Sequence, residues 1–401
     1  MNKLIKHYTD AVLAFAFKDD TTETLLPTTS DDIPTFTERT LNIFKKSRAT
    51  VLVLFGLGNG EHALALRAAL PETARLFVCE TDMNTARAFQ KSNPGWAEEG
   101  TNTNLVCDIS LWAQLYLLAL ANVTPDKTTL VLNPTMDDED RQQYQALQRL
   151  FMQAKPHQAI NSSYLSHVGV AAPDLSVGAI LSPDEPDLDV YFGQFPDWVK
   201  EVVVVWDSET IPETEYSCAV PVRHFAHPLD DFASQRNRML DECEGDWILC
   251  LDGDEMFNED VWSLFPACML VKRLEACYFP RMTLYPDENH SKVGYGLWPD
   301  LQLRLFKNSE AIRFERPIHE RLTGIQGRTA LALDAPILHY SRLRKTPEAL
   351  AAKLKRFDEA SGDAITHVLS NDYPNVERSL FAEASFIMGA IQMLLLEENP
   401  A

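Results

Sequence analysis

Runs of apolar residues that alternate with helical segments are the feature of this sequence that most constrains its fold. The strongest run, "EVVVVW" at 201–206, is almost all valine, which is typical of a strand buried on both faces of a parallel sheet. Other strand-like runs lie at 49–55, 75–82, 103–109, 128–134, 175–182 and 246–255. Amphipathic segments separate most of these runs. The alternation predicts doubly wound parallel sheets.

The length predicts more than one domain. One hydrophobic core rarely serves 401 residues. We expect a first domain at 1–165, a second at 166–344 whose pattern turns mixed after residue 260, and a helical segment at 345–401. The predicted fold class is α/β, with two Rossmann-like domains and a C-terminal helical segment. A polar stretch, "NSSYLSHVGVAAPD", is read as the linker.

Composition excludes some classes of protein. A net charge of -22 repels phosphate backbones, so a general nucleic-acid binder is disfavoured. The seven cysteines are scattered without a C-x-x-C pair, which favours reduced thiols over a zinc site or disulfides. We find no signal peptide and no apolar run long enough to span a membrane. A cytoplasmic protein is expected, with peripheral membrane association as the alternative; the oligomeric state is not indicated.

Three acids directly follow the buried strand "WILCL" at 247–251, namely Asp252, Asp254 and Glu255. Ligands of open α/β sheets bind outside the carboxyl ends of the strands. Two aspartates separated by one residue can face one ion, and their oxygens suit Mg²⁺ or Mn²⁺. The alternative is a solvated strand end, since D-x-D also occurs at 138–140 and 187–189 in an acidic protein.

Nearby segments add polar residues to this strand end. Asp207 ends the valine-rich strand, where an acid can accept hydrogen bonds from a base or a ribose. The "SQRNR" segment places Arg236 and Arg238 on a helix that approaches the same edge of the sheet. Arginine forms forked contacts with phosphate. Surface salt bridging is the alternative role of these arginines.

In this order, three segments resemble a family 2 glycosyltransferase with the GT-A fold. They are "LSVGAILSPDEPDLDVYFGQFPDWVKEVVVVWDSET", "DDFASQRNRMLDECEGDWILCLDGDE" and "DLQLRLFKNSEAIRFERPIHERL". The resemblance is greatest to the branch with lipopolysaccharide-core and tetratricopeptide-linked sugar transferases. It covers residues 175–340 and implies that the second domain has the GT-A fold with a mixed sheet.

The resemblance implies the position of a nucleotide-sugar donor. Asp207 would contact the nucleotide base, and Arg236 with Asn237 would lie near the nucleotide. The family usually has an Asn-Glu pair after its first strand, but here "SPDEP" places Ser182 and Asp184 there. Nucleotide recognition is then altered, or activity is lost. A further arginine, Arg304, would face the diphosphate.

The resemblance also implies a reaction. Asp252 and Asp254 would bind Mg²⁺ or Mn²⁺ on the donor's diphosphate, with His319 as a further ligand of the metal or the diphosphate. Glu320 would orient or activate the acceptor, and with Asp254 it forms the predicted catalytic pair. The implied reaction is metal-dependent, inverting transfer of a sugar to a hydroxyl of a glycan, lipid or protein.

A second candidate site is the glycine-rich turn "VLVLFGLGNGE" in the first domain. Gly56, Gly58 and Gly60 stand between a strand and a helix, and Glu80 ends the next strand. The pattern resembles Rossmann-fold S-adenosylmethionine methyltransferases, so S-adenosylmethionine is a candidate cofactor. Two alternatives stay open: a methyltransferase with a degenerate sugar-binding C-terminal module, and a noncatalytic scaffold.

Aromatic residues form a candidate acceptor site. Tyr295 and Trp298 lie in a segment with two glycines, where their rings could stack on a sugar. Core packing is the alternative for both rings.

Overall fold

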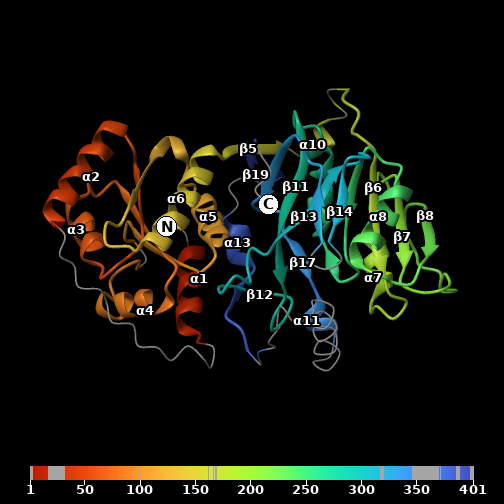
Figure 1. Ribbon diagram of the computed structural model, residues 1–401, viewed down its shortest axis with the longest axis horizontal. Helices are drawn as coiled ribbons and strands as arrows, with labels where there is room; N and C mark the ends of the chain where they lie inside the picture. Colours follow the sequence, from red (N-terminus) through yellow and green to blue (C-terminus); the bar gives the residue numbers. More distant parts are fainter. Residues whose placement is uncertain are drawn as a thin grey trace. The chain divides into compact units, whose positions relative to one another are not determined.

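The computed structural model describes residues 3–16, 32–98, 100–160, 162–165, 167, 169–316, 320–345, 370, 372–384 and 389–397 (Figure 1). The chain divides into two compact units. Unit 1 comprises residues 1–154, 289–299 and 370–386, and unit 2 comprises 155–288, 300–369 and 387–401. Among the described helices, none combines the length and apolar character needed to span a membrane.

Unit 1 is built on a parallel sheet with the strand order β3-β2-β1-β4. The strands are β1 (Val51–Phe55), β2 (Arg75–Glu80), β3 (Thr103–Cys107) and β4 (Thr128–Leu132). The helices are α1 (Lys3–Ala14), α2 (Ile33–Ser47), α3 (Glu61–Ala69), α4 (Met83–Ser92), α5 (Leu111–Leu120) and α6 (Asp138–Gln153). The short 3-10 helix η1 (Pro125–Lys127) precedes β4. The predicted doubly wound parallel sheet is thus confirmed for this unit.

Local sequence signals set the starts of several unit 1 helices. Asp82 caps α4, Ser110 caps α5 and Asp137 caps α6, each by a side-chain oxygen that accepts a backbone N–H of the first turn. Such caps satisfy donors that have no partner within the helix. Because each cap follows a strand or its loop, it fixes where the chain turns back onto the sheet.

Two later segments complete unit 1. They contain β12 (His290–Lys292), which pairs antiparallel with β18 (Asn375–Glu377), and α13 (Ser379–Ala384). Trp298 is fully buried there, with its ring 5.7 Å from Tyr8, 5.8 Å from Tyr116 and 4.9 Å from Phe381 between centroids. The core of unit 1 is therefore assembled from three separate stretches of sequence.

Unit 2 is built on a mixed sheet with the main order β5-β19-β16-β11-β13-β9-β6-β7-β8. Four neighbouring strands of this sheet pair in parallel, namely β6 (Leu175–Leu181), β7 (Glu201–Trp206), β8 (Val222–Ala226) and β9 (Trp247–Cys250). The other strands of this sheet are β5 (Lys155–Ile160), β10 (Glu255–Met256), β11 (Leu274–Thr283), β13 (Leu301–Lys307), β16 (Arg328–Ala332), β17 (Ile337–His339) and β19 (Ala390–Leu396). Strand β11 also pairs in parallel with β16 and β17. The expected change from parallel to mixed pairing is confirmed.

Helices and a small hairpin accompany this sheet. The hairpin is β14 (Arg313–Glu315) with β15 (Arg321–Thr323). The helices are η2 (Ser162–Tyr164), α7 (Leu188–Gly193), α8 (Phe232–Glu242), α9 (Glu259–Trp262), α10 (Phe265–Met269) and α11 (Ser341–Arg344). Helix α8 packs on β6 and β7 (Figure 1).

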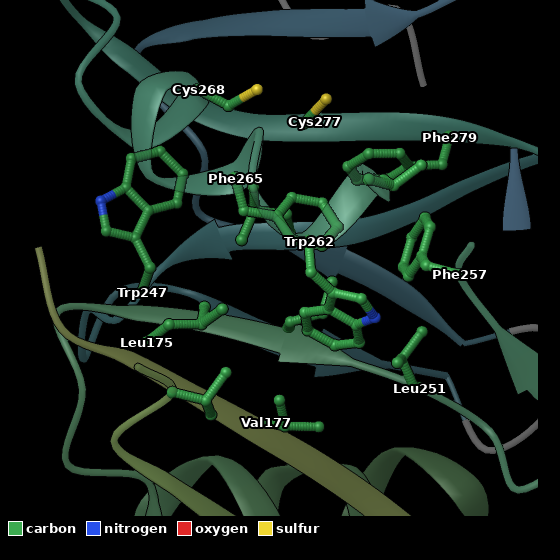
Figure 2. Packing of buried hydrophobic residues seen from close by; sticks show 14 of the residues in the cluster. Leu175, Val177, Trp247, Leu251, Phe257, Trp262, Phe265, Cys268, Cys277 and Phe279 are labelled. Atoms are coloured by element: carbon green, nitrogen blue, oxygen red, sulfur yellow. The ribbon is translucent and has the colours of Figure 1, made fainter. Parts of the chain in front are cut away.

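The core of unit 2 is rich in aromatic rings (Figure 2). Phe257, Trp262, Phe265 and Phe279 pack edge to face with centroid distances of 5.0 to 5.9 Å. Such aromatic pairs add to the stabilisation from apolar burial. This cluster supports β9, whose end carries the acidic residues.

The two units differ from the expected domain ranges. β5 pairs with β19 in the sheet of unit 2, although residue 165 was the expected boundary. Residues 289–299 belong to unit 1, although they lie in the middle of the expected second domain. The helical prediction for 345–401 is wrong at 390–396, where an apolar run forms β19 because it pairs with both β5 and β16. Residues 346–369 lie outside the described part of the chain.

Candidate functional site

The strand order of unit 2 creates a reversal point between β6 and β9. From β6 the chain proceeds to β7 and β8 on one side, and β9 then pairs with β6 on the other side. Ligands in open α/β sheets bind at the carboxyl ends of strands beside such a point. Ser182 follows β6, Asp207 follows β7 and Asp252 follows β9, so the three segments end at this edge.

Asp252 lies between two buried guanidinium groups. Nη2 of Arg236 donates to Asp252 Oδ1 at 3.1 Å, and Nη2 of Arg304 donates to Asp252 Oδ2 at 2.6 Å. Nε of Arg236 also donates to Glu320 Oε1 at 2.7 Å. These contacts join β9, α8 and β13 in one charged network that includes four of the predicted site residues.

The network lowers the pKa of Asp252 and raises the pKa of the two arginines. Burial raises the pKa of Asp252, but Arg304 and then Arg236 outweigh it and hold that pKa well below its usual range. Burial lowers the pKa of Arg304, and Asp252 and Glu255 raise it above its usual value. Burial also lowers the pKa of Arg236, and Asp252 outweighs that effect and raises the pKa above its usual value. Asp252 is therefore a carboxylate and both arginines are cations.

Asp254 faces different partners from Asp252. Nζ of Lys345 lies 2.9 Å from Asp254 Oδ2 and 2.6 Å from Glu185 Oε1. Nε2 of His339 lies 3.5 Å from Asp254 Oδ1. The chain between the two aspartates packs closely on the end of β6, because a Cβ at Gly253 would lie 2.9 Å from Glu185 Cγ. The D-x-D pair is thus split between two sets of cations.

Glu255 is fully buried behind the two aspartates. Its Oε1 accepts from Arg304 Nη2 at 2.6 Å and from Arg281 Nη1 at 3.2 Å. Its Oε2 accepts the backbone N–H of Asp252 at 3.3 Å. Glu255 therefore orients the loop.

The remaining predicted donor-binding residues lie at the same strand ends. Asp207 Oδ1 accepts the backbone N–H of Leu229 at 2.8 Å, which joins the end of β7 to the loop before α8. Ser182 Oγ accepts the backbone N–H of Asp184 at 3.3 Å in the turn after β6. Asp184 is exposed. These side chains shape the loops and keep further lone pairs for a ligand.

Asn237 has a local structural task. Its Nδ2 donates to the carbonyl of Phe314 at 2.9 Å, and its Oδ1 accepts the N–H of the same residue at 2.9 Å. The amide therefore ties α8 to β14, which uses both polar ends of the side chain. His319, predicted as a ligand of the metal or diphosphate, lies outside the described residues.

The arrangement of donors tests the predicted divalent cation. In the described part of the chain, no three His, Cys, Asp or Glu side chains gather as metal ligands. Both oxygens of Asp252 carry guanidinium hydrogen bonds, and Lys345 is bonded to Asp254. Mg²⁺ and Mn²⁺ need oxygen ligands that are not already held by cations. The described residues do not fit such an ion as they stand.

The glycine turn of unit 1 lies at a second reversal point, between β1 and β4. Side chains of unit 1 pack closely on its three glycines. A Cβ at Gly56 would lie 2.7 Å from Met136 Cε, and one at Gly58 would lie 2.6 Å from Thr135 Oγ1. A Cβ at Gly60 would lie 2.4 Å from the ring of Phe89. All three glycines have positive φ values, between 57° and 86°, which glycine adopts readily.

Glu80 is likewise occupied within unit 1. Its carboxylate accepts the backbone N–H groups of Leu57 at 2.7 Å, and of Thr81 and Asp82 at 2.8 Å each. Burial raises the pKa of Glu80 and these hydrogen bonds oppose that rise. The residues predicted for S-adenosylmethionine are therefore close together and are used to hold the turn after β1.

The predicted acceptor residues belong to unit 1. Tyr295 Oη donates to the carbonyl of Phe15 at 2.7 Å and accepts from Arg87 Nη2 at 2.9 Å. Trp298 is fully buried, so its ring cannot stack on a sugar and core packing is its observed role. The sequence alone could not decide between sugar stacking and core packing for Trp298, because its packing partners are far away in the sequence.

Several residues at the strand ends are not among the residues predicted for the donor site. Arg344 is the last residue of the expected second domain, Lys345 is the first of the expected helical segment, and Arg281 lies on β11. The cationic segment "ILHYSRLRK" indicates Arg344 and Lys345, either as a patch for an anionic acceptor or as partners of nearby carboxylates, but the sequence does not show which carboxylates these are. Glu185, in the loop after β6, was seen only as part of "SPDEP".

Comparisons with known proteins give limited likeness. No protein-family model matches the chain. Over 156 residues the chain is 29% identical to a TPR repeat-containing protein of Synechococcus elongatus, a match that covers 38% of this chain and 36% of that protein. The chain thus spans about a third of the length of this curated relative.

Solved structures are similar to the chain only weakly. S. aureus TarS 1-349 is 18% identical with a TM-score of 0.23, over 29% of this chain and 39% of that one. Its complex with UDP-GlcNAc is 14% identical with a TM-score of 0.31, over 46% and 64%. The O-methyltransferase TomG from Streptomyces achromogenes, in complex with SAM, is 17% identical with a TM-score of 0.24, over 47% and 72%. Likeness at this level carries no argument about activity.

Proposed function

We propose that the chain is a glycosyltransferase whose unit 2 binds a nucleotide-sugar donor. The observation that carries the proposal is the reversal point between β6 and β9, where Asp207, Asp252, Arg236 and Arg304 lie on or beside the strand ends. The ordered motifs in residues 175–340 support the same assignment. The acceptor would be a hydroxyl of a glycan, lipid or protein.

The proposed binding mode follows from the chemistry of the groups. Asp207 would accept hydrogen bonds from the base or ribose, beside Ser182 and Asp184 at the neighbouring strand end. The diphosphate would lie toward the arginines, because guanidinium groups bind phosphate oxygens through paired N–H donors. The site excludes much of the solvent around Arg236 and Arg304, which strengthens such contacts.

The proposed reaction is a direct displacement. The acceptor oxygen attacks the anomeric carbon while the bond from that carbon to the diphosphate oxygen breaks, and its electron pair leaves with the diphosphate. Attack from the opposite face inverts the anomeric centre. We assign the acceptor's proton to Glu320, whose Oε1 is held by Arg236 and whose Oε2 is the oxygen for the proton. Asp254, the other predicted catalytic residue, would orient the site through Lys345.

The predicted Mg²⁺ or Mn²⁺ stays a prediction, and no step is assigned to it. S-adenosylmethionine as a cofactor of unit 1 also stays a prediction. The close packing of Met136, Thr135 and Phe89 on the three glycines supports a structural role for that loop.

Release of nucleoside diphosphate from UDP-, GDP-, ADP- and dTDP-linked sugars tests the proposal, with and without Mn²⁺. We expect the full chain to hydrolyse or transfer at least one of these donors, and Asp252→Asn to lower the rate at least roughly tenfold because the arginines lose their anchoring charge. Asp189→Asn is the matched control, since Asp189 is an exposed acid of another D-x-D pair. An inactive wild type, or an Asp252→Asn rate equal to that of the control, would contradict the proposal.

A further inference from the structure

Lys345 is held between two acids that come from different strand ends. Its ammonium lies 2.6 Å from Glu185 Oε1 and 2.9 Å from Asp254 Oδ2. The side chains are nearly buried, with exposed fractions of 12% for Lys345, 18% for Glu185 and 5% for Asp254. The ammonium of Lys345 therefore links the loop after β6 to the loop after β9.

The ammonium keeps its proton in this position. Burial lowers the pKa of Lys345, but Asp254 and Glu185 outweigh that effect and raise it above its usual value. An ammonium has three N–H donors. One of them is donated to Asp254 Oδ2, and the contact with Glu185 Oε1 is an ion pair, so the ammonium has donor capacity left for a ligand.

Arg344, next in the chain, has a donor to spare. Its Nε lies 3.0 Å from Asp187 Oδ2, and its Nη2 donates to Met256 Sδ at 3.4 Å. Its Nη1 is buried and makes no hydrogen bond with the residues that the structure describes. The side chain is nine-tenths buried. Leaving such a donor unpaired is costly, and an anion would satisfy it.

A second unpaired donor lies in the adjoining network. Nε of Arg304 is buried and, within the described ranges, has no hydrogen-bond partner. Arg304 already bridges Asp252 and Glu255 through Nη2. Among the described residues, buried guanidinium donors without a hydrogen-bond partner thus occur on Arg304, which contacts Asp252, and on Arg344, which precedes Lys345 in the chain. An anionic ligand satisfies such donors.

Resting on the proposed donor site, we infer that Lys345 and Arg344 bind the diphosphate of the nucleotide, and that this binding requires no divalent cation. Lys345 supplies the positive charge beside Asp254 that an ion would otherwise supply. A divalent cation ligated by Asp254 and Glu185 has to displace the ammonium first. This differs from the sequence-based expectation of Mg²⁺ or Mn²⁺ on the same aspartate.

The arrangement makes a specific prediction about removal of the lysine. Lys345→Met leaves Asp254 and Glu185 facing each other without their shared cation. Two such carboxylates are suitable ligands for Mn²⁺. The variant is therefore expected to bind nucleoside diphosphate more weakly in EDTA and to regain affinity when Mn²⁺ is present, a change that a purely structural role of Lys345 does not produce.

Calorimetric titration of the full chain with UDP, GDP and ADP, in EDTA and in Mn²⁺, tests the inference. We expect wild-type binding of at least one of them in EDTA, and a loss of affinity of roughly tenfold to a hundredfold in Lys345→Met that Mn²⁺ restores. Arg344→Met should weaken binding in both buffers, and Lys345→Arg should retain binding in EDTA. Arg342→Met is the matched control, because it removes one positive charge from the same short helix.

The outcomes separate the inference from the proposed function. Wild-type binding that requires Mn²⁺ overturns the inference and leaves the donor site standing. Binding in EDTA that is unchanged in both Lys345→Met and Arg344→Met also overturns the inference. If Lys345→Met does not fold, as judged by thermal melting, the Arg344→Met result and the wild-type result in EDTA decide. If the wild type binds none of the three nucleotides in EDTA and none in Mn²⁺, the inference and the proposed function are both contradicted.

Discussion

Asp252 and Asp254 are one residue apart, yet each has its own cations. Gly253 makes this division possible, since a Cβ there would lie 2.9 Å from Glu185 Cγ and 3.0 Å from Leu181 Cδ2. The loop therefore packs against the end of β6, with Asp252 facing the arginines and Asp254 facing Lys345. Breaking a buried ion pair costs more free energy than breaking an exposed one. These partners therefore hold the loop around Gly253 in one conformation.

At the residue scale, the clearest pH dependence is expected from Asp108 in unit 1. Tyr8 Oη and the backbone N–H groups of Ser110 and Gly296 donate to its carboxylate. Burial raises the pKa of Asp108 to about 6, although these hydrogen bonds oppose the rise. The folded state then holds this proton more tightly than the unfolded state, so its stabilising contribution is present at low pH and is lost as the pH rises.

The prediction is a loss on the order of 3 kcal/mol as the pH rises from 3.8 to about 6. Asp108→Asn cannot titrate. The free energy of unfolding of the wild type, relative to that of the variant, should therefore fall as the pH rises over that window. Urea unfolding at a series of pH values measures it. A difference that stays constant, or that grows in favour of the wild type, would show that Asp108 does not titrate in this way.

At the scale of elements, α8 is positioned by a glycine in the neighbouring strand. A Cβ at Gly178 of β6 would lie 2.0 Å from Met239 Sδ on α8. The same helix carries Arg236, three residues before Met239, and so the close approach of helix and strand sets where the guanidinium meets Asp252. The site depends on this packing as well as on its charged residues.

Gly178→Ala should therefore lower the free energy of unfolding by about 1–3 kcal/mol through overpacking. It should also weaken nucleoside diphosphate binding, because Arg236 moves with the helix. Gly193→Ala is the control, since a Cβ there meets no heavy atom within 4 Å. Unfolding and calorimetry of the two variants check this, and equal behaviour of both would refute the role of Gly178.

Much of the element pattern could be predicted from local sequence. The valine run became β7, and "WILC" became β9 with Asp252 just beyond it. Both follow from periodicity and from the rule that ligand sites lie at strand ends. Sequence did not predict β19, because an isolated apolar run reads as helix or strand until its pairing partners are known. Asn237 was assigned to a nucleotide for a similar reason: its partner, Phe314, is distant in sequence.

At the scale of the whole molecule, the chain builds two units from interleaved segments. Residues 289–299 and 370–386 join unit 1, while 387–401 return to unit 2. Domain boundaries read from composition assume that each unit is continuous in sequence, which is why the expected breaks after 165 and 344 do not describe this division. The burial of Trp298 follows from the same interleaving.

Trp298→Ala should destabilise unit 1 by about 3–5 kcal/mol, since it removes a fully buried ring packed on Tyr8, Tyr116 and Phe381. Hydrogen exchange resolved by peptide should show faster exchange in β1 to β4. Ile43→Ala, at a half-exposed position of α2, is the control and should change little. Unchanged exchange in unit 1 would mean that residues 289–299 do not complete its core.

The location of the nucleotide tests the central claim most directly. Photo-crosslinking of azido-labelled UDP, GDP and ADP to the full chain, followed by peptide mapping, identifies which strand ends face the base. The account predicts adducts in the segments after β6 and β7, around Ser182 to Asp187 and around Asp207, with competition by unlabelled nucleotide. Competed adducts confined to the glycine turn around Gly58, or no competed adducts in unit 2, would contradict it.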